Sequence, residues 1–241
     1  MIKSPNAKLY IGPFEEVKID IRPKLTFLDF PDNIGAKYNQ YDDSLSSDEY
    51  NSLLYKWLYK ACSITNGPVF ITFNEKHTRV IENAIHDQNI PLIQRIYWRF
   101  NFGQNQKKKY SPDTRPIYWL NNNTIYPDKI KIPSARQIKY HDKRAKDGGK
   151  LPSNVWEFSR ICGTFKEKRK WHVNQIPESL VERIIIGHSM ENDWVLDGFS
   201  GSGTSAYVSI KNNRNFIGVD IDSYYIDQTK IELYNRFGLT I

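Results

Sequence analysis

A glycine-rich loop is the strongest chemical signal in the sequence. It reads Asp197-Gly-Phe-Ser-Gly-Ser-Gly-Thr204 and follows a short apolar run that begins at Trp194. Glycines let the backbone turn tightly and approach a ligand, and a helix beginning near Thr204 offers free N–H groups to an anion. Asp220 ends the next apolar run, about 20 residues further on, where a carboxylate can accept hydrogen bonds from ribose hydroxyls. This spacing predicts a nucleoside-cofactor site, and it differs from a P-loop because no lysine follows the last glycine.

Positive charge is concentrated in the middle of the chain. The 241 residues carry a formal net charge of +7, but residues 101–150 hold 12 Lys/Arg against 4 Asp/Glu, a local excess of +8. Lysine and arginine neutralise phosphates, and asparagine, glutamine and arginine can read base edges. A solvated, flexible insert is the competing interpretation. We predict a nucleic-acid partner contacted by Lys107, Lys108, Lys109, Arg136, Lys143 and Arg144.

Alternating apolar runs and amphipathic stretches indicate the elements that must position these residues. The expected strands are 25–29, 69–73, 94–100, 194–197 and 215–220, and the expected helices are 47–58, 77–88, 177–188, 205–211 and 224–237. Such alternation predicts an α/β fold with a mostly parallel sheet, in a single domain over 1–241. Residues 101–155 have weak periodicity and are expected to form an insert laid on that sheet.

The glycine loop resembles motif I of the amino-directed DNA methyltransferases, which methylate adenine N6 or cytosine N4. Upstream, residues 171–183 are similar to the family's motif X segment His-Pro-x-Gln-Lys-Pro, with Val173 for the usual proline and Ile176 for the usual lysine. Downstream, residues 216–220 resemble the acidic motif II. The motif order is that of the family's circularly permuted β group, in which a target-recognition region, here 101–155, separates the catalytic motif from the cofactor motifs.

This resemblance implies a Rossmann-like fold, S-adenosylmethionine as cofactor and DNA as substrate. It also implies which residues bind the cofactor. Asp220 would hold the ribose, and Asn174 and Gln175 would sit near the cofactor's carboxylate end. The remaining cofactor residues lie in the glycine loop: Asp197, Phe199, Gly201, Gly203 and Thr204.

The family's catalytic tetrapeptide, Asp/Ser-Pro-Pro-Tyr, corresponds here to Asp29-Phe30-Pro31-Asp32. An aromatic amine is a weak nucleophile because its lone pair is delocalised into the ring. A carboxylate that accepts its N–H bonds localises and orients that lone pair, so Asp29 is the expected acceptor, with the carbonyl of Phe30 as a second. Aspartate rather than serine at this position favours adenine.

The fourth tetrapeptide residue departs from the family pattern. An aromatic side chain there normally stacks on the base after the base leaves the DNA helix. Asp32 cannot stack, so we expect Phe30, Tyr38 or Tyr41 to replace it, or Asp32 to hydrogen-bond a base edge instead.

Several classes of protein are disfavoured by the sequence. Cys62 and Cys162 stand far apart, which fits neither a disulfide framework nor a metal site. No apolar run approaches the roughly 18 residues that span a bilayer, so a cytoplasmic protein is expected. The five histidines are scattered, methyl transfer of this kind needs no metal, and members of this group often act as homodimers.

The sequence therefore predicts an S-adenosylmethionine-dependent DNA adenine-N6 methyltransferase. Three alternatives stay open. Cytosine N4 is the second candidate target. The altered tetrapeptide also fits a catalytically impaired, cofactor-binding adaptor subunit of a larger enzyme. An enzyme of the same fold that modifies RNA or an already modified base is the third.

Overall fold

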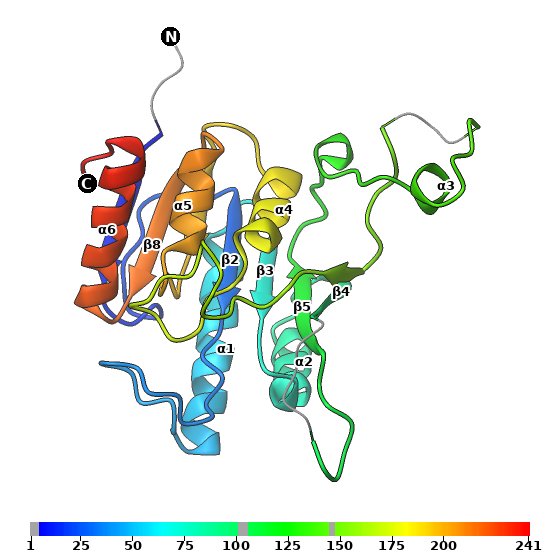
Figure 1. Ribbon diagram of the computed structural model, residues 1–241. Coiled ribbons are helices and arrows are strands. Elements are labelled where there is room, and N and C mark those ends of the chain that lie inside the picture. The colour runs from blue at the N-terminus through cyan, green and yellow to red at the C-terminus, as the bar shows by residue number, and fades with distance from the viewer. Residues whose placement is uncertain (1–4, 101–105, 145–147) are drawn as a thin grey trace.

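The computed structural model describes residues 5–100, 106–144 and 148–241 and contains one eight-stranded sheet in the order β1-β8-β7-β2-β3-β5-β4-β6 (Figure 1). Its strands are β1 (Ala7–Ile11), β2 (Leu25–Asp29), β3 (Val69–Thr72), β4 (Leu92–Arg99), β5 (Thr114–Leu120), β6 (Val155–Glu157), β7 (Trp194–Asp197) and β8 (Asn215–Asp220). The α-helices are α1 (Ser47–Ile64), α2 (Thr78–Asp87), α3 (Ala135–Ile138), α4 (Glu178–His188), α5 (Thr204–Lys211) and α6 (Ser223–Phe237). Two 3₁₀ turns complete them, η1 (Glu75–His77) and η2 (Pro127–Lys129).

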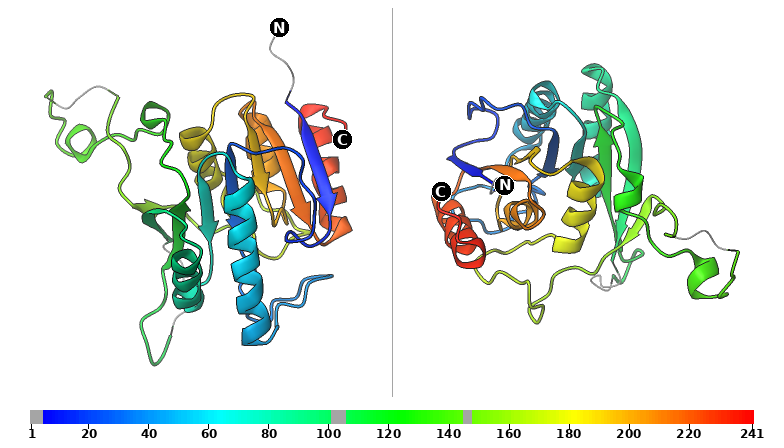
Figure 2. Two further views of the ribbon diagram at one scale, coloured as in Figure 1. Left: turned by 180° about the vertical axis from the view of Figure 1, so that it is seen from behind. Right: turned by 90° about the horizontal axis from the view of Figure 1, so that it is seen from above.

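The sheet is covered by helices on both faces. Helices α1 and α2 lie on one face, and α4, α5 and α6 lie on the other (Figure 2). Strand β2 packs against the helices on both faces of the sheet, because alternate side chains of a strand point to opposite faces. Phe27 packs in the cluster that contains α4, whereas Leu28 packs in the cluster that contains α1. A sheet buried on both sides needs apolar strands, which is why the sequence shows short continuous apolar runs.

The predicted α/β fold with a mostly parallel sheet is confirmed. Strands β2, β7 and β8 have the predicted bounds, and α1 begins after the capping box formed by Ser46 and Glu49. This reciprocal pair satisfies N–H groups that the first turn of a helix leaves free.

Three strands were missed in the sequence, namely β1, β5 and β6. The most consequential is β5, which lies inside the region 101–155 that was expected to be an insert. It is hydrogen-bonded to β3 on one side and β4 on the other, and among the described strands it alone runs antiparallel to its neighbours. Pro116 obscured it, because proline lacks the N–H that a central strand needs. Pro116 lies just beyond the paired length of β3, and its carbonyl accepts a hydrogen bond from Thr72 Oγ1 at 3.0 Å.

The described part of the basic region that follows β5 forms a projecting arm, which we define as residues 121–144 and 148–154 (Figure 1). It contains η2 and α3, and its described chain closes on itself through a bridge between Ile132 and Lys150. Its base is fastened to the end of α4, where the Tyr126 N–H donates to the Gly187 carbonyl at 2.7 Å and His188 Nδ1 lies 2.7 Å from the Thr124 carbonyl. No helix in the described ranges is long and apolar enough to cross a membrane.

We expect Gly67→Ala to destabilise the fold because a Cβ there would lie 2.1 Å from the Lys24 carbonyl oxygen. Such overpacking against backbone costs about 1–3 kcal/mol. The matched control is Gly163→Ala, whose added Cβ would meet no heavy atom within 4 Å. Urea unfolding of both variants measures the difference, and equal midpoints would contradict the tight approach at Gly67.

Candidate active site

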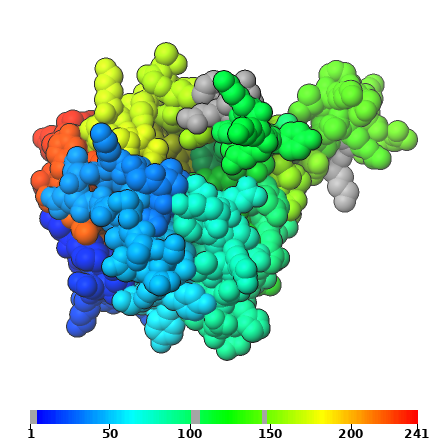
Figure 3. Space-filling view, turned by 90° about the horizontal axis from the view of Figure 1, so that it is seen from below, coloured from blue at the N-terminus to red at the C-terminus, as the bar shows by residue number. Residues whose placement is uncertain are grey.

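Three carboxylates meet at the carboxyl edge of the sheet. Asp29 ends β2, Asp197 ends β7 and Asp220 ends β8, and these strands run parallel and are neighbours in the order β8-β7-β2. All three line one cavity of about 940 Å³. The space-filling view of this end of the molecule shows the segments after β2 (blue), before β5 (green) and after β6 (yellow-green) around its mouth (Figure 3).

The glycine loop wraps one end of this cavity. Gly201 and Gly203 have positive φ values of 43° and 70°, which side chains rarely adopt. A Cβ on Gly201 would lie 2.8 Å from His172 Nε2, so the loop packs against the segment before α4. The Gly201 N–H donates to Asp220 Oδ2 at 2.6 Å. The loop is therefore held open toward the cavity by backbone geometry that only glycine permits.

The carboxylates of Asp197 and Asp220 are largely shielded from water. Burial raises the pKa of Asp197 to about 7, opposed by hydrogen bonds from the Ser205 side chain and the Phe199 N–H. Burial likewise raises the pKa of Asp220 to about 6, opposed by hydrogen bonds from the N–H groups of Asp222 and Gly201. A cation in the cavity would stabilise both carboxylates in their charged form.

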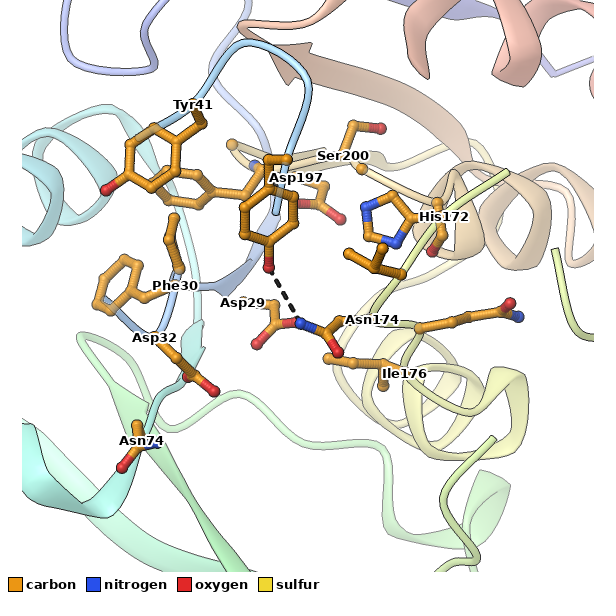
Figure 4. A pocket seen from close by; sticks show the side chains of 18 of the residues that line it. Asp29, Phe30, Asp32, Tyr41, Asn74, His172, Asn174, Ile176, Asp197 and Ser200 are labelled. Carbon is orange, nitrogen blue, oxygen red and sulfur yellow. Dashed lines mark hydrogen bonds between the residues drawn. The ribbon is translucent and has the colours of Figure 1, made fainter. Parts of the chain in front are cut away.

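Aromatic side chains form the wall between the glycine loop and β2. Phe30 is 1% exposed and packs edge-on against Phe199, with ring centroids 5.6 Å apart, and against Trp57 at 5.4 Å. Its ring therefore belongs to the core. This burial disfavours Phe30 as the ring that stacks on a base; Tyr38 and Tyr41, both half-buried, line the cavity and keep that prediction, and Tyr41 is seen there in Figure 4.

Asp32 does not take the place of an aromatic side chain. Its carboxylate lies beside that of Asp29 (Figure 4), and both contact one guanidinium, that of Arg115 on β5. Arg115 Nη2 donates to Asp29 Oδ1 at 2.8 Å, and Nη1 lies 2.9 Å from Asp32 Oδ1 and 3.1 Å from Oδ2. Arg115 Nε also donates to Thr72 Oγ1 at 3.0 Å.

Burial and the neighbouring charges together shift the pKa values of Asp29 and Arg115. Burial raises the pKa of Asp29 to about 6, the positive charge of Arg115 lowers it, and the negative charge of Asp32 raises it. Burial alone would lower the pKa of Arg115, but the two carboxylates raise it above its ordinary value. Arg115 is therefore charged at any physiological pH.

The loop after β2 is fixed by many contacts. The carboxylate of Asp43 accepts hydrogen bonds from the N–H groups of Asn33, Ile34 and Ala36 at 2.8–3.0 Å. The Pro31 carbonyl accepts from the Tyr50 hydroxyl, and His77 Nε2 lies 2.9 Å from the Asp32 carbonyl. The tetrapeptide Asp29–Asp32 is thus held at both backbone and side chain.

The segment before α4 places Asn174 and Gln175 at the cavity, but with different freedom. The Gln175 amide is engaged within the chain, because Oε1 accepts from the Arg169 N–H and Nε2 donates to the Glu167 carbonyl, each at 2.8 Å. Asn174 Nδ2 donates to the Tyr38 hydroxyl at 3.2 Å across the mouth (Figure 4). A cofactor contact stays a prediction for both residues.

A second buried arginine ties this segment to the glycine loop. Arg169 Nε donates to Glu232 Oε2 at 2.7 Å, and Nη2 donates to Glu178 Oε1 at 3.1 Å. Nη1 donates to Thr204 Oγ1 at 3.1 Å, at the beginning of α5. The Arg169 side chain is 4% exposed, so this network sets the position of Thr204 from behind the cavity.

Some buried polar atoms at the cavity have no partner among the described residues. They are Ser200 Oγ, Asp222 Oδ2, His172 Nδ1, Tyr41 OH and Asp32 Oδ1, the last of which lies 2.9 Å from Arg115 Nη1 as an ion pair. Buried polar groups are nearly always hydrogen-bonded, so these atoms can bind water or a polar ligand. Within the described part of the chain no cluster of His, Cys, Asp and Glu could hold a metal ion.

The predicted DNA-binding cations are all exposed but fall into two groups. Lys107, Lys108 and Lys109 stand in the loop before β5, and Lys109 lines the cavity. Arg136, Lys143 and Arg144 lie instead on the arm, which leaves the sheet from the opposite end of β5 (Figure 1). Residues 101–105 and 145–147 of this predicted region lie outside the described residues.

Sequence reasoning missed two functional candidates, Arg115 and Arg169. Arg115 could have been found if residues 114–120 had been taken as a strand, because it would then stand at the edge of the sheet that holds Asp29. No local pattern marks Arg169.

Comparisons with known proteins agree with this geometry. A family model described as DNA methylase matches residues 24–231. The type II methyltransferase M.HpaI of Haemophilus parainfluenzae is 33% identical over 97% of this chain and 74% of its own length. The DNA adenine methyltransferase YhdJ of Escherichia coli (strain K12) is 30% identical over 84% of this chain and 73% of its own. The solved structure of the cytosine-N4-specific PvuII DNA methyltransferase shares the fold, with a TM-score of 0.71 and 16% identity over 94% of this chain and 86% of the other.

We expect Arg169→Met to lower the free energy of unfolding by about 3 kcal/mol, because it leaves the largely buried Glu178 without its ion pair and leaves Glu232 with Arg236 alone. Burial already raises the pKa of Glu178, and Arg169 opposes that rise. The pKa of Glu178 should rise further in the variant, so its carboxyl binds a proton more readily when folded, and the loss of stability should be smaller in mildly acidic buffer. Urea unfolding at both pH values tests this. The control Lys230→Met removes only an exposed pair with Asp227 and should change little.

Proposed function

The chain belongs to the DNA methylase family whose model spans residues 24–231, and on this premise we propose that it methylates the N6 amino group of adenine in DNA. The observation that carries the proposal is the position of Asp29. Its carboxylate stands at the end of β2, in the same cavity as the glycine loop that ends β7. A base amine and a methyl donor can therefore meet within one enclosure.

S-adenosylmethionine is the methyl donor, and the cavity residues fit it. Its sulfonium supplies a methyl group that is activated toward nucleophiles. The buried carboxylates of Asp29, Asp197 and Asp220 suit a ligand of positive charge. The partnerless Ser200 Oγ and Asp222 Oδ2 offer hydrogen bonds to its polar groups, and the glycine loop lets the ligand approach the backbone.

Asp29 would act on the base amine. An ionised carboxylate accepts the amine's N–H bond, which orients the nitrogen lone pair toward the donor and stabilises the positive charge that develops on that nitrogen. The rigid loop after β2 supports this role, because three backbone N–H groups bound to Asp43 fix the residues beyond Asp32. The reaction should therefore require Asp29 in its charged form.

Adenine is the favoured target for two reasons. Position 29 holds aspartate rather than serine, and YhdJ, a DNA adenine methyltransferase, is 30% identical over most of this chain. Cytosine N4 is the second candidate, because the family includes enzymes of both kinds. Homodimer formation stays a prediction, which sedimentation of the purified chain would test.

DNA contacts are proposed for both groups of cations. Lys109 lines the cavity, and Lys107 and Lys108 are exposed next to it in the loop before β5, where all three can neutralise phosphates beside an extruded base. The arm would contact DNA at a distance from the target base, through Arg136, Lys143 and Arg144.

The first test is methyl transfer to unmodified double-stranded DNA. Purified protein is incubated with labelled S-adenosylmethionine, and the nucleosides from digested DNA are identified by mass spectrometry. We expect N6-methyladenine, and a loss of about 100-fold or more in Asp29→Asn, because the neutral amide accepts the amine proton poorly. Calorimetry should show that the variant still binds S-adenosylmethionine.

The control variant is Asp48→Asn, which changes an exposed carboxylate at the beginning of α1. N4-methylcytosine in the digest would select the second candidate. Methyl transfer to RNA and not to DNA would show that the substrate is RNA. Cofactor binding with no transfer to either nucleic acid would contradict the enzyme and favour the adaptor subunit.

Removing the positive charges of Lys107 and Lys108, in the loop before β5, should weaken DNA binding in a salt-dependent way. The double variant Lys107→Gln with Lys108→Gln should bind every DNA sequence less tightly, because phosphate contacts carry no sequence information. The slope of log affinity against log salt should shrink by about 0.9 per lost phosphate contact. Fluorescence anisotropy across a salt series measures both quantities.

The matched control changes Lys8 and Lys56 to glutamine. Both are exposed, and both lie outside the loop before β5, Lys8 in β1 and Lys56 in α1. Equal salt slopes for the two double variants would contradict a DNA contact at Lys107 and Lys108.

A further inference from the structure

We propose that Arg115 and Asp32 form a positioning pair, in which Asp32 holds the guanidinium of Arg115 and Arg115 holds the carboxylate of Asp29 toward the base amine. The inference rests on the proposed function of Asp29 and gives the unusual fourth tetrapeptide residue a role. Asp32 then acts through Arg115 and does not contact the base.

The geometry of Arg115 is that of a buried clamp. Its side chain is 18% exposed, and it spans from β5 to the loop after β2 across the end of β3. Arg115 Nη2 donates to Asp29 Oδ1 at 2.8 Å, and Nη1 lies 2.9 Å from Asp32 Oδ1. Arg115 Nε donates to Thr72 Oγ1 at 3.0 Å. A planar guanidinium fixed at three points holds its partners in a defined direction.

The clamp leaves a defined part of Asp29 for the substrate. Arg115 occupies Oδ1, so the second oxygen, Oδ2, remains to accept the amine N–H. Placing a reacting group to within a fraction of an ångström matters, because a misplacement of about 1 Å can cost roughly 100-fold in rate. A carboxylate with one fixed oxygen meets that demand better than one that rotates.

The negative charge of Asp32 offsets the positive charge that Arg115 brings to the site. An arginine paired with Asp29 alone would make a neutral site, which is unfavourable for an amine that becomes positive as it is alkylated. With Asp32 included, one guanidinium and two carboxylates carry a net charge of −1. An aromatic side chain at position 32 would leave Arg115 with only one counter-charge in a buried position, which is costly.

Other charged or titratable groups also face this cluster. Asp197 approaches Asp29 from β7, and Tyr38 approaches it from the loop after β2. His77, from η1, lies against the Asp32 backbone, and Lys76 and Lys109 line the same cavity. None of these replaces the direct contacts of Arg115, which bridges both carboxylates.

The test is the titration of Asp29 itself, followed by carbon-13 NMR of labelled aspartate carboxyl groups, with Asp29→Asn used to assign the signal. Asp32→Asn removes a negative neighbour, so the pKa of Asp29 should fall below its value of about 6. Arg115→Gln removes a positive neighbour, so the pKa should rise. Arg115→Lys keeps the charge and should leave the pKa nearer to that of the native protein.

Kinetics with unmodified DNA give the second readout. Asp32→Asn and Arg115→Lys should each lower kcat by about 10- to 100-fold with little change in KM for DNA, because they misplace Asp29 without removing a DNA contact. The acidic limb of the pH profile should move with the pKa of Asp29 in each variant. Asp87→Asn, an exposed carboxylate at the end of α2, is the control for both readouts.

Opposite shifts of the Asp29 pKa in the two neutralising variants are the result that supports the pair. An unchanged Asp29 titration in Asp32→Asn, together with a raised KM for DNA, would overturn it and make Asp32 a base-reading residue. If Arg115→Gln does not fold, Asp32→Asn and Arg115→Lys decide the question. The titration needs no turnover, so a protein without methyltransferase activity would disprove the proposed function while the pair could still be measured.

Discussion

Three carboxylates crowd the ends of three neighbouring strands, and the rest of the site is built to keep them there. Burial raises the pKa of Asp29, Asp197 and Asp220 alike, so each needs donors that favour its charged form. Backbone N–H groups of the glycine loop serve Asp197 and Asp220, and Arg115 serves Asp29. What remains is a negatively charged enclosure, which suits a cationic methyl donor and an amine that becomes positive during transfer.

Two buried arginines fix the two ends of this enclosure by the same physical means. Arg115 bridges Asp29 and Asp32 at the end of β2, and Arg169 bridges Glu178 and Glu232 behind the glycine loop. Each buried cation is compensated by two carboxylates, because a single unpaired charge in such a place would cost several kcal/mol. Each arginine also joins segments that are distant in sequence, so neither end of the cavity can move without breaking buried ion pairs.

The departure at the fourth tetrapeptide residue changes how the carboxylate of Asp29 is held. Where the family places an aromatic ring, this chain places Asp32, and β5 supplies the arginine that gives Asp32 a partner. Phe30, next to it, has become part of the core between Trp57 and Phe199. The half-buried Tyr38 and Tyr41 of the following loop line the cavity instead, and base stacking by these rings stays a prediction.

The sequence by itself determined the α/β fold, the strands that end in Asp29, Asp197 and Asp220, and the glycine loop, because periodicity and turn chemistry are local and can be read within a few residues. It did not determine β5, whose Pro116 argues against a central strand. Only the tertiary structure decided that Arg115 contacts Asp29 across 86 residues and that Arg169 contacts Glu232 across 63. The tertiary structure also places the basic residues in two groups, one in the loop before β5 and the other on the arm after β5. Such contacts follow from strand order and helix packing, and a linear pattern of residue types carries no record of either.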